Sequence, residues 1–142
     1  MPHKRKEQAS SFSLQNDIKR ITAENCFYRR VLCTGPHSQL VVMSVSPECD
    51  TGERNEEDTD KVFLIVRGTA KSFLNKCTRD AAKHDVIFVP AGNLHNLINS
   101  GRRDLKLLIV YSPPLYPVGT VHRTAEDALE AEEAKSARAW EQ

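Results

Sequence analysis

The chain has 142 residues, 39% of them hydrophobic, and a formal net charge of +1. This length suits a single domain, and the small net charge excludes the strongly basic class of nucleic-acid and membrane-surface binders. No apolar run approaches the length of a membrane span and no hydrophobic signal segment is present, so we expect an intracellular, cytoplasmic protein. The charge is uneven: basic residues dominate the beginning of the chain and acidic residues dominate from Thr124 onward.

The four cysteines show no C-x-x-C spacing, which argues against a metal-binding or redox motif. They are Cys26, Cys33, Cys49 and Cys77. In an intracellular protein we expect them to be reduced, and most of them to be buried as small hydrophobic side chains.

The chain begins with a polar, serine-rich segment, residues 1–12, which we expect to form a flexible tail. Residues 14–25 carry apolar side chains at helical spacing and predict a short helix, with Ser13 or Asn16 as its N-cap. Short runs of β-branched and other apolar residues follow, separated by glycine and proline. These runs predict strands at 31–33, 39–45, 61–66, 70–74, 85–89, 95–99 and 105–111. Residues 13–123 therefore predict an all-β barrel or sandwich preceded by a helix.

The end of the chain predicts a second helix. Ser112-Pro113-Pro114 ends the last strand, because proline cannot donate to a sheet. Thr124 precedes several acidic residues, the pattern of a helix N-cap and first turn. We expect an acidic C-terminal helix within residues 124–142. Its apolar positions are mostly alanine, so it is either a weakly packed surface helix or one that frays.

One corner of the predicted barrel places a histidine at a defined position. Pro90 and Gly92 predict a turn after the strand at 85–89. Beyond the turn, alternation puts His95, Leu97 and Asn99 on the same face of the next strand. A histidine facing into a barrel is either a ligand or acid–base group, or a hydrogen-bonded core residue, and this segment leaves both open.

The same corner carries a resemblance to a known family. The spacing His84-x5-Pro90-x-Gly92-x2-His95-x3-Asn99 resembles the second sequence motif of the cupin superfamily, with His84 standing where the family usually has glycine.

Other parts of the chain extend the resemblance. Gly68 fits the final glycine of the first cupin motif. Residues 15–25, 32–43, 111–114 and 119–122 are similar to small single-domain cupins that are often described as mannose-6-phosphate isomerase-like. The resemblance implies a double-stranded β-helix, or jelly roll, with a metal in the barrel mouth, and a homodimer paired through outer strands.

The metal positions implied by the resemblance are largely replaced. Counting back from Gly68 places Lys61, Glu56 and Arg54 at three of the four ligand positions, and only His95 keeps the family's residue. Ammonium and guanidinium groups have no lone pair to give a metal at neutral pH. We therefore predict a degenerate metal site and no metal cofactor.

Two arrangements of these residues remain open. In one, Arg54, Glu56 and Lys61 form charge pairs that replace the metal. In the other, Glu53, Glu56, Asp58 or Asp60 joins His95 in a rearranged site for one divalent transition metal, with Glu56, His95 and possibly Asp60 as ligands. A register slip of one residue would exchange Asp60 for Lys61.

The remaining histidines give weaker signals. His122 follows Gly119-Thr-Val in a stretch similar to the family, and it lies either near the barrel mouth or on the surface. His37 and His84 lie in a turn and before a strand, and we expect both to be exposed.

Three functions are compatible with this pattern. A metal-free cupin could bind an anionic small molecule, such as a sugar phosphate, through Arg54 and Lys61, with His122 as a further pocket candidate. A structural or interaction protein would act through its homodimer. The alternative is a metal-dependent enzyme resembling sugar-phosphate isomerases, in which Glu56 and His95 hold the metal and Lys61 or a carboxylate moves the proton. None of the three involves nucleic acid or a membrane.

Overall fold

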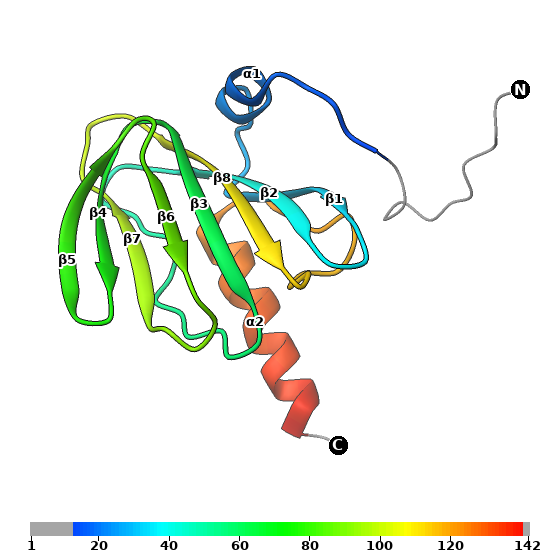
Figure 1. Ribbon diagram of the computed structural model, residues 1–142. Coiled ribbons are helices and arrows are strands. Elements are labelled where there is room, and N and C mark those ends of the chain that lie inside the picture. The colour runs from blue at the N-terminus through cyan, green and yellow to red at the C-terminus, as the bar shows by residue number, and fades with distance from the viewer. Residues whose placement is uncertain (1–12, 141–142) are drawn as a thin grey trace, which may run out of the picture.

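The computed structural model describes residues 13–140 (Figure 1). The expected flexible tail at 1–12 lies outside the described residues. The elements, in chain order, are α1 (Ile18–Ala23), β1 (Arg29–Thr34), β2 (Gln39–Val45), β3 (Asp60–Arg67), β4 (Thr69–Leu74), β5 (Cys77–Ala82), β6 (Val86–Val89), β7 (His95–Asn99), β8 (Leu105–Ser112), β9 (Val121–His122) and α2 (Ala125–Trp140). Neither described helix has both the length and the apolar character needed to cross a membrane.

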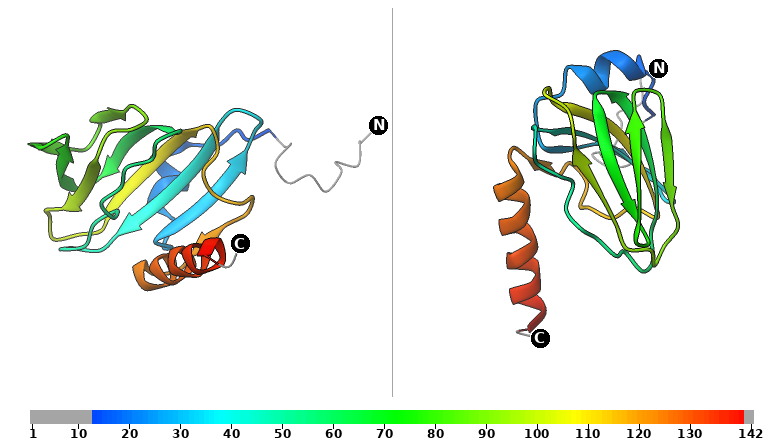
Figure 2. Two further views of the ribbon diagram at one scale, coloured as in Figure 1. Left: turned by 90° about the horizontal axis from the view of Figure 1, so that it is seen from below. Right: turned by 90° about the vertical axis from the view of Figure 1, so that its left-hand side faces the viewer.

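The strands form two antiparallel sheets that pack face to face (Figure 2). The larger sheet has the order β6-β3-β8-β2-β1-β9, and the smaller one has the order β5-β4-β7. Gly68 lies where the chain passes from β3 in the larger sheet to β4 in the smaller one. The predicted all-β architecture with a short helix near each end is confirmed.

The core lies between the sheets because alternate side chains of each strand point inward. In β3 this alternation buries Lys61, Phe63 and Ile65. The inward apolar residues of the larger sheet include Val41, Met43, Val45, Phe63, Ile65, Leu105, Leu107 and Ile109. Helix α1 contacts β3 and β8, and just after it the carbonyl oxygen of Asn25 accepts from the buried Lys106 of β8. Lys61 precedes Phe63 and Ile65 on the inward face of β3, so this polar side chain lies at one end of the apolar stretch.

Two local elements differ from the sequence prediction. The helix predicted at 14–25 is shorter, because the side chain of Asp17, rather than Ser13 or Asn16, accepts the backbone N–H of Arg20 and begins it. Strand β5 was not predicted, since five of its six residues are exposed and carry no alternating pattern. The turn Asn75-Lys76, with φ of 48° and 71°, folds β5 back onto β4.

The prediction that most cysteines are buried is wrong. Cys26, Cys49 and Cys77 are exposed and Cys33 is half-buried; all four thiols are free. Cys26 and Cys49 lie in loops, and Cys77 begins the exposed edge strand β5. Cys77 lies on the same face of β5 as the buried Ala81, but it is the first residue of an edge strand and stays exposed, so its position outweighs the intrinsic tendency of cysteine to be buried.

Helix α2 is continuous and lightly packed. Thr124 Oγ1 accepts the backbone N–H of Asp127 at 3.1 Å, as a predicted N-cap should. Ala128 is 4% exposed, whereas the neighbouring Leu129 is 57% exposed. The helix runs alongside the sandwich, and its C-terminal end projects beyond the sheets (Figure 2). Only a narrow strip of α2 therefore contacts the rest of the protein.

Candidate functional site

The candidate site is the polar part of the space between the sheets. Its walls are formed by Arg29, Met43, Thr51, Arg54, Lys61, Phe63, His95, Tyr111 and Tyr116. The free space between these side chains is about 10 Å³, close to the room that one water molecule needs. Three of the predicted residues, Arg54, Lys61 and His95, line this space. The interior is thus filled by the protein's own side chains.

Lys61 and His95 form a direct buried pair. They are 3% and 2% exposed, and Lys61 Nζ lies 2.9 Å from His95 Nε2. His95 Nδ1 lies 2.8 Å from the carbonyl oxygen of Asn93, which can only accept. The Nδ1 atom therefore carries the hydrogen, and Nε2 accepts from the Lys61 ammonium. Lys61, not Asp60, points inward, so the register assumed from the sequence is correct.

The pKa values of both members of this pair are lowered, chiefly by burial. Burial lowers the pKa of Lys61 to about 8, although the Glu56 carboxylate opposes the shift. Burial also lowers the pKa of His95, and the Lys61 charge adds to that effect. His95 is consequently neutral near pH 7, in agreement with its hydrogen bonds.

Arg54 and Glu56 reach the site from the long connection between β2 and β3 rather than from a strand. Arg54 forms an isolated bridge with His95, in which each backbone N–H donates to the other's carbonyl at 2.9 Å. The Glu56 carboxylate lies 3.4 Å from Arg54 Nη1 and 3.8 Å from Lys61 Nζ. The predicted charge pairs among Arg54, Glu56 and Lys61 are therefore present.

Arg29 is a site residue that the sequence reading missed. It is 1% exposed, and its guanidinium lies between the rings of Tyr28 and Tyr116, 5.2 and 4.7 Å from their centroids. Its Nε atom has no hydrogen-bond partner, and no carboxylate of the described residues forms an ion pair with it. Arg29 lies two residues before the inward-facing Val31, an alternation that could have placed it inside.

His122 lies next to Arg29 and not on the open surface. Strand β9 pairs His122 with Arg29, and Arg29 Nη1 donates to His122 Nδ1 at 3.1 Å. Burial and the Arg29 charge lower the pKa of His122. The structure places His122 half-buried beside Arg29 rather than fully exposed. His37 and His84 are exposed, as predicted.

Glu132, from α2, is the second residue that the sequence reading missed. Its carboxylate forms an ion pair with Arg54 Nη2, and its Oε1 atom is buried. A groove of about 460 Å³ lies between α2 and the loop at 49–54, and both Arg54 and Glu132 line it. Arg54 and Glu132 are far apart in the sequence and share no motif. Their contact could therefore be seen only once the position of α2 was known.

The residues present do not fit a divalent metal ion. One nitrogen of His95 donates to a backbone carbonyl, and the other faces an ammonium group. The Glu56 carboxylate lies between two cations, and Asp60 Oδ1 accepts the backbone N–H of Ala91 at 2.8 Å. Within residues 13–140, no three His, Cys, Asp or Glu side chains are grouped so that they could hold a metal.

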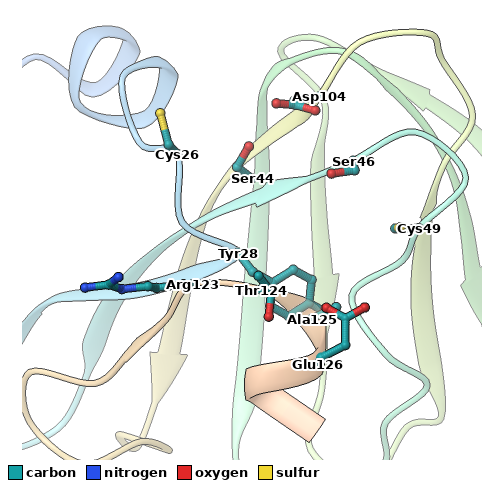
Figure 3. A pocket seen from close by; sticks show the side chains of 10 residues that line it. All are labelled: Cys26, Tyr28, Ser44, Ser46, Cys49, Asp104, Arg123, Thr124, Ala125 and Glu126. Carbon is teal, nitrogen blue, oxygen red and sulfur yellow. The ribbon is translucent and has the colours of Figure 1, made fainter.

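A second hollow of about 240 Å³ lies at the N-terminal end of α2 (Figure 3). Cys26 and Cys49 lie on opposite sides of it, with Tyr28 between them (Figure 3). The Tyr28 hydroxyl donates to the carbonyl oxygen of Asp50 at 2.9 Å, and the ring contacts Arg29 on the interior side. None of the predicted site residues lines this hollow.

Comparison with known proteins identifies a matching domain family and two relatives of this chain. Residues 41–111 match the Cupin domain family. The chain is 37% identical over 124 residues to the uncharacterized protein YrkC of Bacillus subtilis (82% of this chain, 66% of that protein). It is 38% identical over 109 residues to the uncharacterized protein L612 of Acanthamoeba polyphaga mimivirus (74% and 68%). The chain thus spans about two thirds of the length of these curated relatives.

A solved structure resembles the whole sandwich. The crystal structure of BH2720 from Bacillus halodurans superposes with a TM-score of 0.83 at 30% identity, covering 84% of this chain and 96% of that one. The predicted jelly roll is thereby confirmed. Together with the matching domain, this similarity shows that the protein belongs to the cupin superfamily.

Proposed function

We propose that this protein is a metal-free cupin that binds a small anionic molecule through the buried Arg29 of its barrel, once the side chains that now fill the interior move apart to admit it. The observation that carries the proposal is the buried guanidinium of Arg29, which has no carboxylate partner among the described residues. Burying a charge without its counter-ion costs several kcal/mol, so a buried arginine normally faces an anion. A bound anion would supply that partner.

The charges around Arg29 support the same conclusion. Arg29, Arg54 and Lys61, which we call the interior cations, face two carboxylates, Glu56 and Glu132. Both of these carboxylates are engaged by Arg54 or Lys61, so the surplus positive charge lies on the Arg29 side. An arginine fork recognises carboxylate and phosphate groups, which makes an organic acid or a sugar phosphate the proposed ligand class.

Anion titrations of matched arginine variants test this proposal. Inorganic phosphate and acetate, compared with chloride at constant ionic strength, should raise the melting temperature of the native protein by mass action. Arg29→Met should abolish the rise. Arg30→Met is the control, because Arg30 is the exposed neighbour on the opposite face of β1 and should leave the rise unchanged. An equal rise in both variants, or no rise in the native protein, would contradict anion binding at Arg29.

The absence of a metal is part of the proposal and has its own test. The degenerate metal site should leave the purified protein with less than about a tenth of an equivalent of any transition metal, since tight binding needs a complete ligand set. The alternative is a metal-dependent enzyme of the mannose-6-phosphate isomerase-like kind. Stoichiometric metal that is lost in both Glu56→Ala and His95→Ala, with isomerase activity restored by added metal, would establish that alternative instead.

A second candidate role, self-association, rests on the β6 edge of the larger sheet. Strand β6 is the edge of the larger sheet, and its Val86 and Phe88 are 62% and 55% exposed. An exposed apolar edge strand with unpaired backbone groups is a template for pairing with another strand. We infer that two copies pair along β6 to form a homodimer.

Sedimentation of charge variants tests the dimer. Phe88→Lys should convert a dimer into a monomer, because it places a charge in the proposed interface. Val121→Lys should remain dimeric, since Val121 is 44% exposed on β9 at the other edge of the same sheet. A monomeric native protein, or a dimer that tolerates Phe88→Lys, would rule out pairing through β6.

A further inference from the structure

The surroundings of Lys61 differ from those of the other buried lysine of the described residues. Lys61 and Lys106 are 3% and 6% exposed. Lys106 Nζ donates to two oxygen atoms, the carbonyl oxygen of Asn25 at 2.6 Å and Ser44 Oγ at 2.9 Å. Lys61 Nζ instead lies 2.9 Å from a ring nitrogen of His95. An imidazole nitrogen can take up a proton near neutral pH, which a carbonyl or hydroxyl oxygen cannot do.

The charges around Lys61 favour its neutral form as well. Burial is the main cause of the low pKa of Lys61, and the charges of Arg54 and Arg29 act in the same direction. The Glu56 carboxylate opposes this effect, but it lies 3.4 Å from Arg54 Nη1 as well as 3.8 Å from Lys61 Nζ, so it serves two cations. A neutral amine keeps its lone pair and is a nucleophile towards an electrophilic carbon.

His95 is oriented to accept the proton that such an attack releases. Its Nδ1 hydrogen donates to the carbonyl oxygen of Asn93 at 2.8 Å, so the unprotonated Nε2 faces Lys61 Nζ. A nucleophile, a base in hydrogen-bond contact with it, and a third group that orients the base form the usual arrangement for covalent attack by a side chain. Lys61, His95 and the Asn93 carbonyl provide these three parts.

The free space at this pair suits a very small reactant. It is about 10 Å³, and both Lys61 and His95 line it. A sugar phosphate or an amino acid needs far more room than this. Carbon dioxide is a linear molecule of three atoms, so it needs the smallest adjustment of the surrounding side chains. It is also uncharged, and it can pass between packed side chains without the desolvation cost of an ion.

The interior is suited to the product of such a reaction. A primary amine and carbon dioxide give a carbamate, an anion with the planar shape of a carboxylate. Arg29 and Arg54 line the same space as Lys61, and the buried Nε of Arg29 has no hydrogen-bond partner among the described residues. Guanidinium forks match planar oxyanions. A carbamate on Lys61 would therefore balance the surplus positive charge with a group of the protein itself.

We propose that Lys61 is a carbon dioxide acceptor whose side chain is reversibly converted to a carbamate. The amine lone pair forms a bond to the carbon, one C=O electron pair moves onto oxygen to give O⁻, and the N–H proton passes to His95 Nε2. The carbamate anion and the imidazolium then form a neutral pair. This inference goes beyond the proposed function: it shares the charge of Arg29 with it but concerns a covalent modification, and a carbamate would compete with a bound anion.

Carbon NMR in isotope-labelled bicarbonate tests the proposal. Native protein should show a carbamate resonance that is lost in Lys61→Met; the terminal amine can give a carbamate of its own, which both proteins would share. Lys71→Met is the control and should keep the resonance, since Lys71 is exposed and paired with Asp80. Alkylation with a trialkyloxonium salt, followed by peptide mass spectrometry, should place the trapped carbamate on Lys61 and not on Lys106. Identical spectra of native protein and Lys61→Met would overturn the proposal.

Arginine variants separate this inference from the proposed function. Arg29→Met should lower the formation constant of the Lys61 carbamate about tenfold, because a charge-assisted hydrogen bond to the anion is lost. Arg30→Met should leave it unchanged, since Arg30 is exposed on the opposite face of β1. An equally stable carbamate in Arg29→Met would overturn the pairing with Arg29. If no carbamate forms but phosphate or acetate still stabilises the protein through Arg29, only this inference fails; if the carbamate forms and no anion binds, only the proposed function fails.

Discussion

At the scale of single residues, Lys61 contacts more of the polar side chains of the barrel interior than a sequence pattern suggests: His95, Glu56 and Tyr111. Its ammonium donates to His95 Nε2, lies 3.8 Å from the Glu56 carboxylate and lies 5.5 Å from the centre of the Tyr111 ring. The ammonium group of Lys61 thus gives His95 Nε2 a hydrogen-bond donor in the place where a metal ion would otherwise bind it. Its burial has a measurable consequence for stability.

Lys61 should make the protein more stable as the solution becomes more alkaline. Its pKa is about 8 in the folded protein, against an ordinary value of 10.5. Between these values the unfolded chain binds more protons than the folded one, so the free energy of unfolding rises with pH. The full difference of 2.5 pH units corresponds to about 3 kcal/mol.

Urea unfolding of native protein and Lys61→Met at several pH values measures this effect. The difference, native minus variant, should be flat below about pH 8 and should rise towards pH 10.5, because the variant lacks the titrating group. Tyrosines and exposed lysines titrate in both proteins and cancel. A difference that stays constant or falls over this range would show that Lys61 is not buried as an amine of low pKa.

His84 is predicted to be a position where glycine stabilises the protein. Its φ is 77°, in the left-handed region that side chains disfavour, and the resemblance to cupins already places glycine there. His84→Gly should raise the free energy of unfolding by about 1 kcal/mol. Lys83→Gly is the control, since Lys83 is exposed and its φ is not positive; it should be destabilising. A loss of stability in both variants would contradict the prediction.

At the scale of elements, the corner between β3 and β4 depends on Gly68. Its φ is 99°, and a Cβ atom there would lie 3.2 Å from Leu105 Cα. Gly68→Ala should therefore combine backbone strain with a steric clash and cost about 3 kcal/mol. Gly119→Ala, with a φ of 76° and no atom within 4 Å, isolates the strain and should cost about 1 kcal/mol. Denaturation curves with equal losses for the two variants would exclude the clash.

The elements also show what a sequence can predict. Two features could be predicted from the local sequence: the turn at Pro90 and Gly92, and which side chains of β7 point inward. Turn-forming residues and the alternation of side chains along a strand are both local properties. Strand β5 could not, since it owes its conformation to pairing with β4 rather than to its own exposed side chains. The position of Glu132 depends on how α2 docks, which is a tertiary contact that no local pattern encodes.

At the scale of the whole molecule, the apolar core and the polar interior are separable. The apolar core lies between the two sheets and is built largely by β2, β3 and β8. The interior cations reach the site from β1, β3 and the loop before β3. The Cupin domain match covers residues 41–111, so it includes Arg54, Lys61 and His95 but neither Arg29 nor Glu132. The fold and the pairing of Glu56 with Arg54 and Lys61 were therefore predictable from the sequence, but Arg29 and the contact of Arg54 with Glu132 were not.

This separation predicts that the barrel can be given a metal without losing its fold. Arg54→His combined with Lys61→Glu removes two positive charges and frees His95 Nε2, which leaves four potential ligands with Glu56. The double variant should bind Zn²⁺ or Mn²⁺ with a stoichiometry of about one, as a complete ligand set predicts. Calorimetry measures this gain. Arg54→His alone should not bind, because the Lys61 ammonium still faces His95; equal binding by both variants would contradict this role of Lys61.

The exposed thiol of Cys49 makes the docking of α2 accessible to spectroscopy. Cys49 lines both the groove beside α2 and the hollow at the helix's N-terminal end (Figure 3). A nitroxide or fluorophore attached to its sulfur would sit next to the helix without altering any charge around Arg54. Cys26→Ser and Cys77→Ser would leave Cys49 as the single exposed thiol of the described residues, because Cys33 is half-buried. The natural sequence thus already carries an attachment point from which the environment of α2 can be followed.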